Sequence, residues 1–255
     1  MKDEFYIGWE KEAPPGIGRM ARRIVLALLL LALLVSAGLA VSQRLIGSSV
    51  FEYGEVKKFS GIFQMNPYPH LLVPRPGITD ERKQFSSYYL VAEWKFGLAP
   101  ETVQTFDGKS VTLNGTLIYR GDQTMIQVAD NSLRVSTAPP PPLTGQEVVP
   151  LGRQTLRGEI VDSKCYLGVM NPGQLTPHRA CAIRCISGGI PPVLLLRSQN
   201  GTAVYLLLVS ANGKPVNQQV LDYVAEPVEI TGEVERQGDF LILRADPAAY
   251  LRIKP

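Results

Sequence analysis

The sequence is poor in the residues on which most enzyme active sites depend. It has only two histidines and three cysteines, and it shows no Gly-rich phosphate loop, no Ser/His/Asp triad and no paired glycosidase carboxylates. It also lacks Cys-x-x-Cys, which argues against a thioredoxin-like oxidoreductase. These absences favour a protein that is not an enzyme on its own.

The chain also lacks an excess of charge of either sign outside its N-terminal segment. Six of the 26 basic and four of the 23 acidic residues lie in residues 1–44, which leaves 20 basic and 19 acidic residues over 45–255. Such a balance gives no electrostatic footprint for nucleic acid and argues against a polyacidic partner. We therefore expect no nucleic-acid partner.

One long apolar run, residues 24–41, predicts a membrane-spanning helix. Ser36 is its only polar side chain, and at 1.5 Å per residue the run spans roughly 27 Å, close to the hydrocarbon thickness of a bilayer. Three arginines lie just before it, so residues 1–23 should stay in the cytoplasm. We expect a single-pass anchor over residues 24–43 in the cell inner membrane, with the C-terminal domains in the periplasm or outside the cell.

Two alternatives remain open for this segment. Gly38 and Ala40 fit the small-residue positions of a signal-peptide cleavage site. The segment before the apolar run would then be 23 residues long and contain Phe-Tyr-Ile-Gly-Trp, which favours an uncleaved anchor. Arg22-Arg23 resembles a twin-arginine export signal, but such a pair before a membrane helix usually sets topology.

Beyond residue 50 the apolar residues alternate, which predicts strands. Four consecutive prolines within residues 138–150 cannot pair in a sheet and predict a stiff linker. The linker separates a first β domain, residues 50–137, from a second, residues 151–255. The expected strands are Glu55–Phe63, Ser87–Trp94, Ser110–Tyr119, Thr124–Val128, Thr155–Val161, Val193–Arg197, Ala203–Val209, Val228–Val234 and Phe240–Arg244.

The two domains look like copies of one another. Residues 109–116 match residues 226–233 at an offset of 117, and a Gly-Asp turn follows each match at the same offset. The glycine inside each matched strand suits a strand that bends at a barrel corner. The fold class is therefore mainly β, with two small barrels like the oligonucleotide/oligosaccharide-binding (OB) fold. Short helices are expected at Pro100–Thr105 and Gln218–Val224.

The second copy carries about twenty extra residues between its first two matched strands, and these contain Cys165, His178, Cys181 and Cys185. The last three stand at i, i+3 and i+7, on one face of a predicted helix that two glycines and two prolines end. Cys165 could close over that face. Three thiols and one imidazole are the ligand set of a closed tetrahedral metal site. The spacing does not separate zinc, copper and an iron-containing centre, because soft thiolates also select Cu(I) and iron–sulfur clusters.

Two other interpretations fit the cysteines. A disulfide from Cys165 to Cys181 or Cys185 would pin the inserted helix to the barrel in an oxidising compartment and leave one thiol free. That thiol could exchange partners, as in a thiol–disulfide oxidoreductase. The spacing of Cys181 and Cys185 is awkward for a disulfide within a helix. Met170, in the same insertion, could be a further soft ligand or a packing residue.

The remaining polar residues near these features are expected at the surface. Glu159, Asp162 and Lys164 should be solvated charges at a strand end, although they could tune the thiols. His70 follows Asn-Pro-Tyr-Pro and should lie in an exposed loop of the first domain.

The pattern D-x-x-C…H-x-x-C-x-x-x-C…G-x-P over residues 162–191 resembles the core of a largely uncharacterised group of bacterial membrane-anchored OB-like envelope proteins. The similarity covers about residues 155–253, and the N-terminal Phe-Tyr-Ile-Gly-Trp resembles anchored members of the group. The resemblance implies an OB topology and a metal or redox site, and it implies no substrate.

We therefore expect an accessory or assembly subunit of a membrane-associated redox system, with a protein partner in a membrane complex and a metal bound by the four Cys/His residues. The competing class is a non-catalytic envelope scaffold whose cysteines only fix the insertion.

Overall fold

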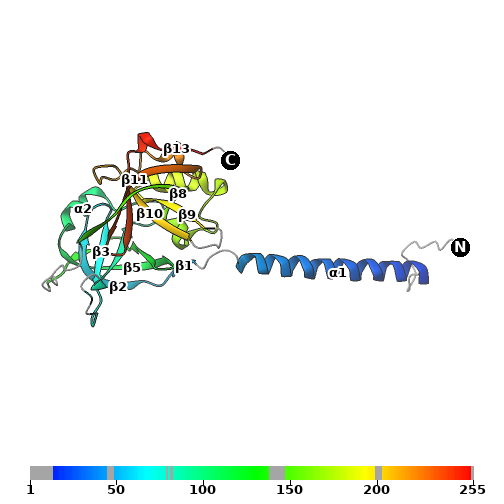
Figure 1. Ribbon diagram of the computed structural model, residues 1–255. Coiled ribbons are helices and arrows are strands. Elements are labelled where there is room, and N and C mark those ends of the chain that lie inside the picture. The colour runs from blue at the N-terminus through cyan, green and yellow to red at the C-terminus, as the bar shows by residue number, and fades with distance from the viewer. Residues whose placement is uncertain are drawn as a thin grey trace. The chain divides into compact units, whose positions relative to one another are not determined.

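The computed structural model describes residues 14–44, 49–78, 80, 83–137, 147–198 and 203–253. The chain divides into two compact units, Met1–Gly47 and Ser48–Pro255. The second unit contains two closed five-stranded β-barrels (Figure 1), so the mainly-β, two-barrel prediction is confirmed.

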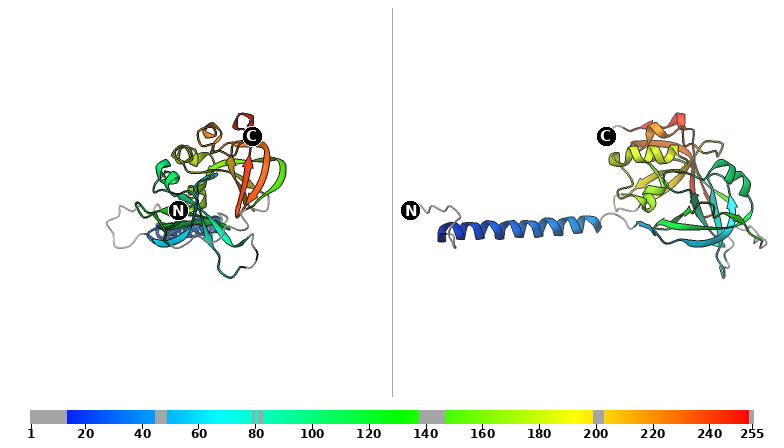
Figure 2. Two further views of the ribbon diagram at one scale, coloured as in Figure 1. Left: turned by 90° about the vertical axis from the view of Figure 1, so that its left-hand side faces the viewer. Right: turned by 180° about the vertical axis from the view of Figure 1, so that it is seen from behind.

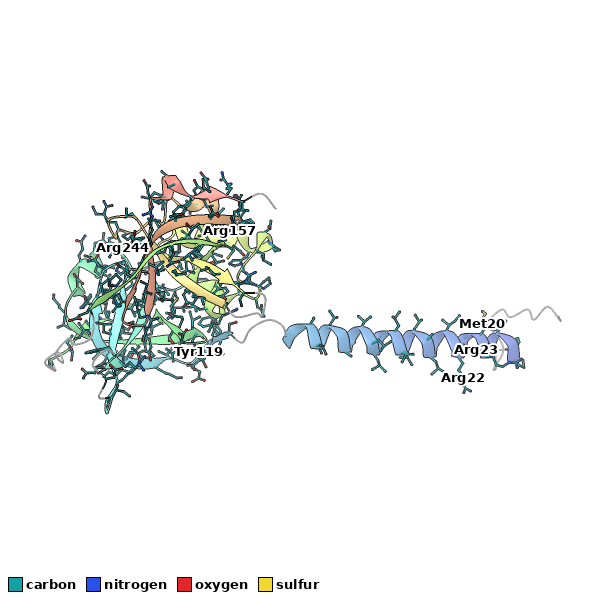
Figure 3. The ribbon with its side chains drawn as sticks, viewed as in Figure 1. Met20, Arg22, Arg23, Tyr119, Arg157 and Arg244 are labelled. Atoms are coloured by element: carbon teal, nitrogen blue, oxygen red, sulfur yellow. The ribbon has the colours of Figure 1, made fainter. Side chains whose placement is uncertain are left out.

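The apolar run lies within one helix, α1 (Pro15–Arg44). Within its span Pro15–Ser42, the most apolar 18-residue window has a mean hydropathy of 3.0, and none of that window is buried. Met20, Arg22 and Arg23 project from its N-terminal part (Figure 3). By length and composition this helix could cross a membrane, as an anchor or as a signal sequence. The Phe-Tyr-Ile-Gly-Trp segment lies outside the described residues.

The elements of the first barrel are β1 (Ser49–Phe51), β2 (Lys57–Gln64), β3 (His70–Pro74), β4 (Phe85–Val91), α2 (Pro100–Phe106), β5 (Ser110–Arg120), β6 (Gln123–Val128) and β7 (Arg134–Val135). β2 pairs with β3 and β5, β3 with β4, and β4 runs parallel to β6, which closes the barrel onto β5. Helix α2 confirms the helix expected at Pro100–Thr105.

The strands of the second sheet are β8 (Val148–Asp162), β9 (Pro192–Arg197), β10 (Ala203–Val209), β11 (Pro227–Gln237), β12 (Phe240–Arg244) and β13 (Leu251–Arg252). The first five form the closed barrel, and β13 pairs with β11. β8 to β12 repeat the pairing of the first barrel, including the parallel pair, here β10 with β12. The helix expected at Gln218–Val224 is wrong, since that segment holds only one 3-10 turn, η4 (Leu221–Tyr223). A further 3-10 turn, η5 (Pro247–Ala249), precedes β13.

Of the linker expected at residues 138–150, the structure describes only residues 147–150. Residues 138–146 lie outside the described residues, and β8 already begins at Val148. The second barrel therefore takes up part of the range assigned to the linker.

A second pair of glycines, Gly61 and Gly158, occupies equivalent places in the two barrels. A Cβ on Gly61 would lie 2.3 Å from the carbonyl oxygen of Leu72, and a Cβ on Gly158 would lie 2.4 Å from that of Leu195. Gly61 lies in β2 and Gly158 in β8, the equivalent strands of the two barrels, where the backbone passes too close to the next strand for any side chain. The shared requirement supports the interpretation that the barrels are copies.

The two barrels pack side by side (Figure 2) and share one buried apolar cluster. Tyr89 of β4 stacks on Phe240 of β12 with ring centroids 4.2 Å apart. The buried Tyr68 hydroxyl donates to the carbonyl of Leu208 (3.3 Å) and accepts from the N–H of Val216 (3.0 Å). The two barrels therefore belong to one compact unit.

Polar contacts also join the barrels through the Gly-Asp turns noted in the sequence. The Asp239 carboxylate, in the turn between β11 and β12, accepts from Arg75 (3.0 Å) and from the N–H of Ser87 in β4 (2.9 Å). Gln123, beside the matching turn of the first barrel, donates to the carbonyl of Asp239 (3.2 Å). The repeated turn therefore helps to build the contact between the copies.

The expectation that His70 is exposed is wrong. Strand β3, which the sequence did not predict, begins at this residue, and only 3% of His70 is exposed. Its ring packs edge-on against Phe240, and Nδ1 lies 2.8 Å from the carbonyl oxygen of Tyr68. Burial lowers the pKa of His70 to about 4, so the ring is neutral at physiological pH.

Candidate metal centre

The insertion in the second barrel folds into three short turns of helix between β8 and β9. They are η2 (Cys165–Val169), a π-type turn, η3 (Thr176–His178), a 3-10 turn, and α3 (Arg179–Ser187). Helix α3 packs along β8 and ends where the N–H of Gly188 bonds the carbonyls of Arg184 and Cys185. The helix and its glycine stop signal are as the sequence predicted.

The fold brings the four predicted ligand residues into two overlapping groups. The sulfur of Cys165 lies 4.0 Å from that of Cys181 and 3.9 Å from that of Cys185. Cys165, His178 and Cys181 have donor atoms within 4.8 Å of one another, as do Asp162, Cys165 and Cys185. Cys165 belongs to both groups, and all three cysteines are free thiols.

The sulfur–sulfur separations suit a shared metal ion. Two thiolates bound tetrahedrally at a Zn–S distance of about 2.3 Å would be about 3.8 Å apart, whereas a disulfide requires about 2.05 Å. The observed 3.9 and 4.0 Å are close to the first value. The Cys/His cluster could therefore hold a metal ion without a large rearrangement of Cys165.

Asp162, at the end of β8, orients both His178 and the start of η2. One carboxylate oxygen accepts from the N–H of Cys165 (2.7 Å), and the other lies 2.9 Å from Nε2 of His178. A carboxylate only accepts, so a neutral His178 carries its proton on Nε2 and its lone pair on Nδ1. A carboxylate behind the imidazole is the usual partner of a metal-binding histidine.

The expectation of solvated charges at this strand end is wrong for all three residues, because Glu159, Asp162 and Lys164 are 9%, 0% and 1% exposed. The Lys164 ammonium donates to the carbonyls of Ala92 (2.9 Å) and Trp94 (2.7 Å) in the first barrel. Burial lowers the pKa of Lys164 to about 8. Its charge is thus held between the two barrels by backbone dipoles.

A loop of the first barrel, residues 92–98, covers the cluster. Lys95 of this loop places Nζ 2.7 Å from the sulfur of Cys181. The N–H of Gly97 donates to the carbonyl of Gly188 (2.9 Å), and a Cβ on Gly97 would lie 2.6 Å from the carbonyl oxygen of Gly189. The close approach of the two backbones requires glycine at this position.

The thiols and lysines of the cluster influence each other's ionisation. The hydrogen bond from Cys165 lowers the pKa of Cys185, and the same contact, together with burial, raises the pKa of Cys165. The hydrogen bond to Cys181 raises the pKa of Lys95. Lys95 therefore remains an ammonium beside the thiols.

Two residues near the cluster were not assigned a definite role from the sequence. Asp162 stands in the D-x-x-C pattern, and its place three residues before Cys165 was the available signal. Lys95 comes from the other barrel, 86 positions from Cys181, and no local pattern marks it. Met170, which the sequence offered as a further soft ligand or a packing residue, is 44% exposed.

Comparison of the sequence with protein-family models and with curated proteins finds no match in either set.

Proposed function

We propose that this protein is a membrane-anchored extracytoplasmic accessory or assembly subunit of a redox system, and that Cys165, His178, Cys181 and Cys185 bind one metal ion in its distal barrel. The observation that carries the metal site is the position of the Cys165 sulfur, 4.0 Å from the sulfur of Cys181 and 3.9 Å from that of Cys185. His178, held by the Asp162 carboxylate, completes a tetrahedral donor set of three thiolates and one imidazole.

The charges around the cluster favour a divalent ion over Cu(I). Three thiolates and the Asp162 carboxylate carry four negative charges, and the ammonium groups of Lys95 and Lys164 carry two positive ones. A divalent ion brings this sum to zero, whereas Cu(I) leaves one uncompensated charge. Cys165, Cys185, Asp162 and Lys164 are at most 3% exposed, and an unpaired charge in such a place is costly. Zinc is therefore the expected metal.

The anchor and the redox association rest on other features. Helix α1 is long and apolar enough to cross a membrane, and the arginines at its start favour an orientation that exports the barrels. Two of the three thiols, Cys165 and Cys185, are buried, which limits their contact with oxidants in an exported domain. A chain without enzyme motifs then acts by holding or passing a metal for a partner in the membrane.

Elemental analysis of the detergent-solubilised full-length chain, combined with free-thiol counting, tests the metal site. We expect one zinc per chain and its loss in Cys181→Ser. Ala180→Ser is the matched control, because it adds the same hydroxyl at the exposed neighbouring position and should retain the metal. A metal-free chain with one free thiol would instead support the disulfide-stabilised scaffold. Copper in place of zinc would contradict the charge argument.

Native electrophoresis of solubilised membranes, with in-gel staining for haem and for dehydrogenase activity, tests the redox association. The chain should migrate in a complex that stains for haem or for dehydrogenase activity. Migration as a free monomer would refute the role as an accessory subunit and leave the metal site as a separate result.

A further inference from the structure

Cys181 differs from the other two thiols in its surroundings. Cys165 and Cys185 are 3% and 1% exposed, whereas Cys181, in the first turn of α3, is only partly buried. The Lys95 ammonium lies 2.7 Å from the Cys181 sulfur, and the sulfur of Cys165 lies 4.0 Å away on the other chain segment. An accessible sulfur next to a cation and a second thiol is the arrangement found at oxidation-sensitive cysteines.

We propose that Cys181 is a peroxide-reactive thiol and Cys165 its resolving thiol, so that hydrogen peroxide or an organic hydroperoxide converts the pair to a disulfide. From the protein, the oxidation requires only the two thiols and Lys95, and it does not depend on a bound metal. Its consequence, release of the metal through loss of two ligands, rests on the function proposed above.

The reaction balances with the peroxide as the oxidant. The Cys181 sulfur attacks one peroxide oxygen, an S–O bond forms, the O–O bond breaks, and the second oxygen leaves as water or as an alcohol after taking up a proton. The sulfur of Cys165 then attacks the sulfenic acid, an S–S bond forms, the S–O bond breaks, and the Cys165 thiol proton leaves with the hydroxide as water. Two thiols are oxidised by two electrons, and the peroxide is reduced.

Lys95 positions and activates Cys181 from the first barrel. Its ammonium stabilises negative charge on the attacking sulfur, and the loop that carries it is fixed by the contact of Gly97 with Gly188. The first barrel thus contributes directly to the reactivity of a thiol in the second barrel, which gives it a chemical role beyond packing.

The geometry selects Cys165 rather than Cys185 as the resolving thiol. Cys181 shares a group of donor atoms with Cys165 and His178, whereas Cys185 shares one with Cys165 and Asp162 and not with Cys181. Cys181 and Cys185 lie in the same helix, where a direct disulfide is sterically awkward. Closing the disulfide requires the Cys165 and Cys181 sulfurs to approach by about 2 Å, and Cys185 is left as the one free thiol.

The test uses the full-length chain in detergent, treated with hydrogen peroxide in a zinc-loaded form and in a chelator-stripped form. Peptide mapping should identify a Cys165–Cys181 disulfide and a free Cys185 in both, with zinc released from the loaded form. In Cys165→Ser the reaction should stop at a Cys181 sulfenic acid, which dimedone traps. A Cys165–Cys185 disulfide, or oxidation first at Cys185, would overturn the proposal.

The role of Lys95 is tested by the rate of Cys181 oxidation. Lys95→Met should slow it by about tenfold or more, the value of a hydrogen bond to a charged group, and Lys95→Arg should restore most of the rate. Lys58→Met removes an exposed lysine from the same barrel and should leave the rate unchanged. An unchanged rate in a folded Lys95→Met protein would contradict the proposal.

The chelator-stripped form of the chain distinguishes failure of this proposal from failure of the proposed metal site. If no metal binds but peroxide forms the Cys165–Cys181 disulfide, the metal site fails and the thiol assignment stands. If metal binds but Cys181 does not react in the stripped chain, the thiol assignment fails alone.

Discussion

Replacing Tyr68 by phenylalanine removes one oxygen atom from the contact between the two barrels. In the native protein that oxygen accepts the N–H of Val216 at 3.0 Å and donates to the carbonyl of Leu208 at 3.3 Å. Tyr68 is 3% exposed and Val216 0%, so water cannot replace the lost acceptor without opening the interface. A buried N–H left without a partner costs about 1–3 kcal/mol, and we expect the free energy of unfolding to fall by that amount.

Denaturation of a fragment starting at Ser49 measures this change. Trp94 is the single tryptophan in the fragment and reports on the first barrel, while labelling of the buried Cys165 and Cys185 thiols reports on the second. Because the barrels share a buried cluster, both probes should give one transition, and Tyr68→Phe should shift both midpoints equally. Tyr53→Phe, at a side chain that is 83% exposed, is the control and should change nothing.

Two results would refute this reasoning. A loss of less than about 0.5 kcal/mol would mean that the Val216 N–H finds another partner. Separate transitions, with only one of them shifted by the substitution, would mean that the barrels fold independently.

Three further substitutions test other parts of the structure. Folded His70 has a pKa of about 4, below that of the unfolded chain, so between about pH 6.5 and 4 the unfolded state takes up a proton that the folded state does not. Stability should therefore fall as the pH falls, by about 2 kcal/mol at pH 5, and His70→Gln should remove this part of the slope in pH-dependent urea melts. Gly97→Ala places a Cβ 2.6 Å from the carbonyl oxygen of Gly189 and should lower the urea midpoint, at a cost of about 1–3 kcal/mol. Asp162→Asn removes the carboxylate behind the histidine and should weaken zinc binding in competition titrations by about 10- to 100-fold, whereas Asp222→Asn, at an exposed position, should not.

Each of these has a clear contrary outcome. An identical pH slope in wild type and the His70 variant would place the titrating group elsewhere. An unchanged urea midpoint for Gly97→Ala would mean that the loop is not held against the insertion. Equal zinc affinity for Asp162→Asn would remove the carboxylate from the support of the site.

Local patterns in the sequence predicted the barrels and the insertion, because these depend on neighbouring residues. The alternation of apolar and polar residues predicted most strands. The spacing of His178, Cys181 and Cys185 predicted a helix, which the structure confirms. Strand β3 was missed because Pro67 and Pro69 precede His70 and suggest a loop. Its partners are β2 and β4, and such pairing is a tertiary property.

The support of the candidate site could not be predicted from the sequence for the same reason. Lys164 looks like a solvated charge in its own segment, and it is buried only because the carbonyls of Ala92 and Trp94 accept its hydrogen bonds from the first barrel. No local sequence pattern distinguishes Lys95 in its loop either. Both contacts arise from the packing of the two copies, which neither copy encodes alone.

Because a loop of the first barrel covers the thiols, the cluster can form only late, after both barrels have been synthesised and folded. Lys95 and Cys181 are separated by 86 positions, and the strands that close the second barrel, β11 and β12, come later still. The cluster is therefore complete only after the whole chain has been synthesised and both copies have packed. If the chain is exported as proposed above and crosses the membrane unfolded, any metal must be acquired on the far side of the membrane, after assembly of the last strands.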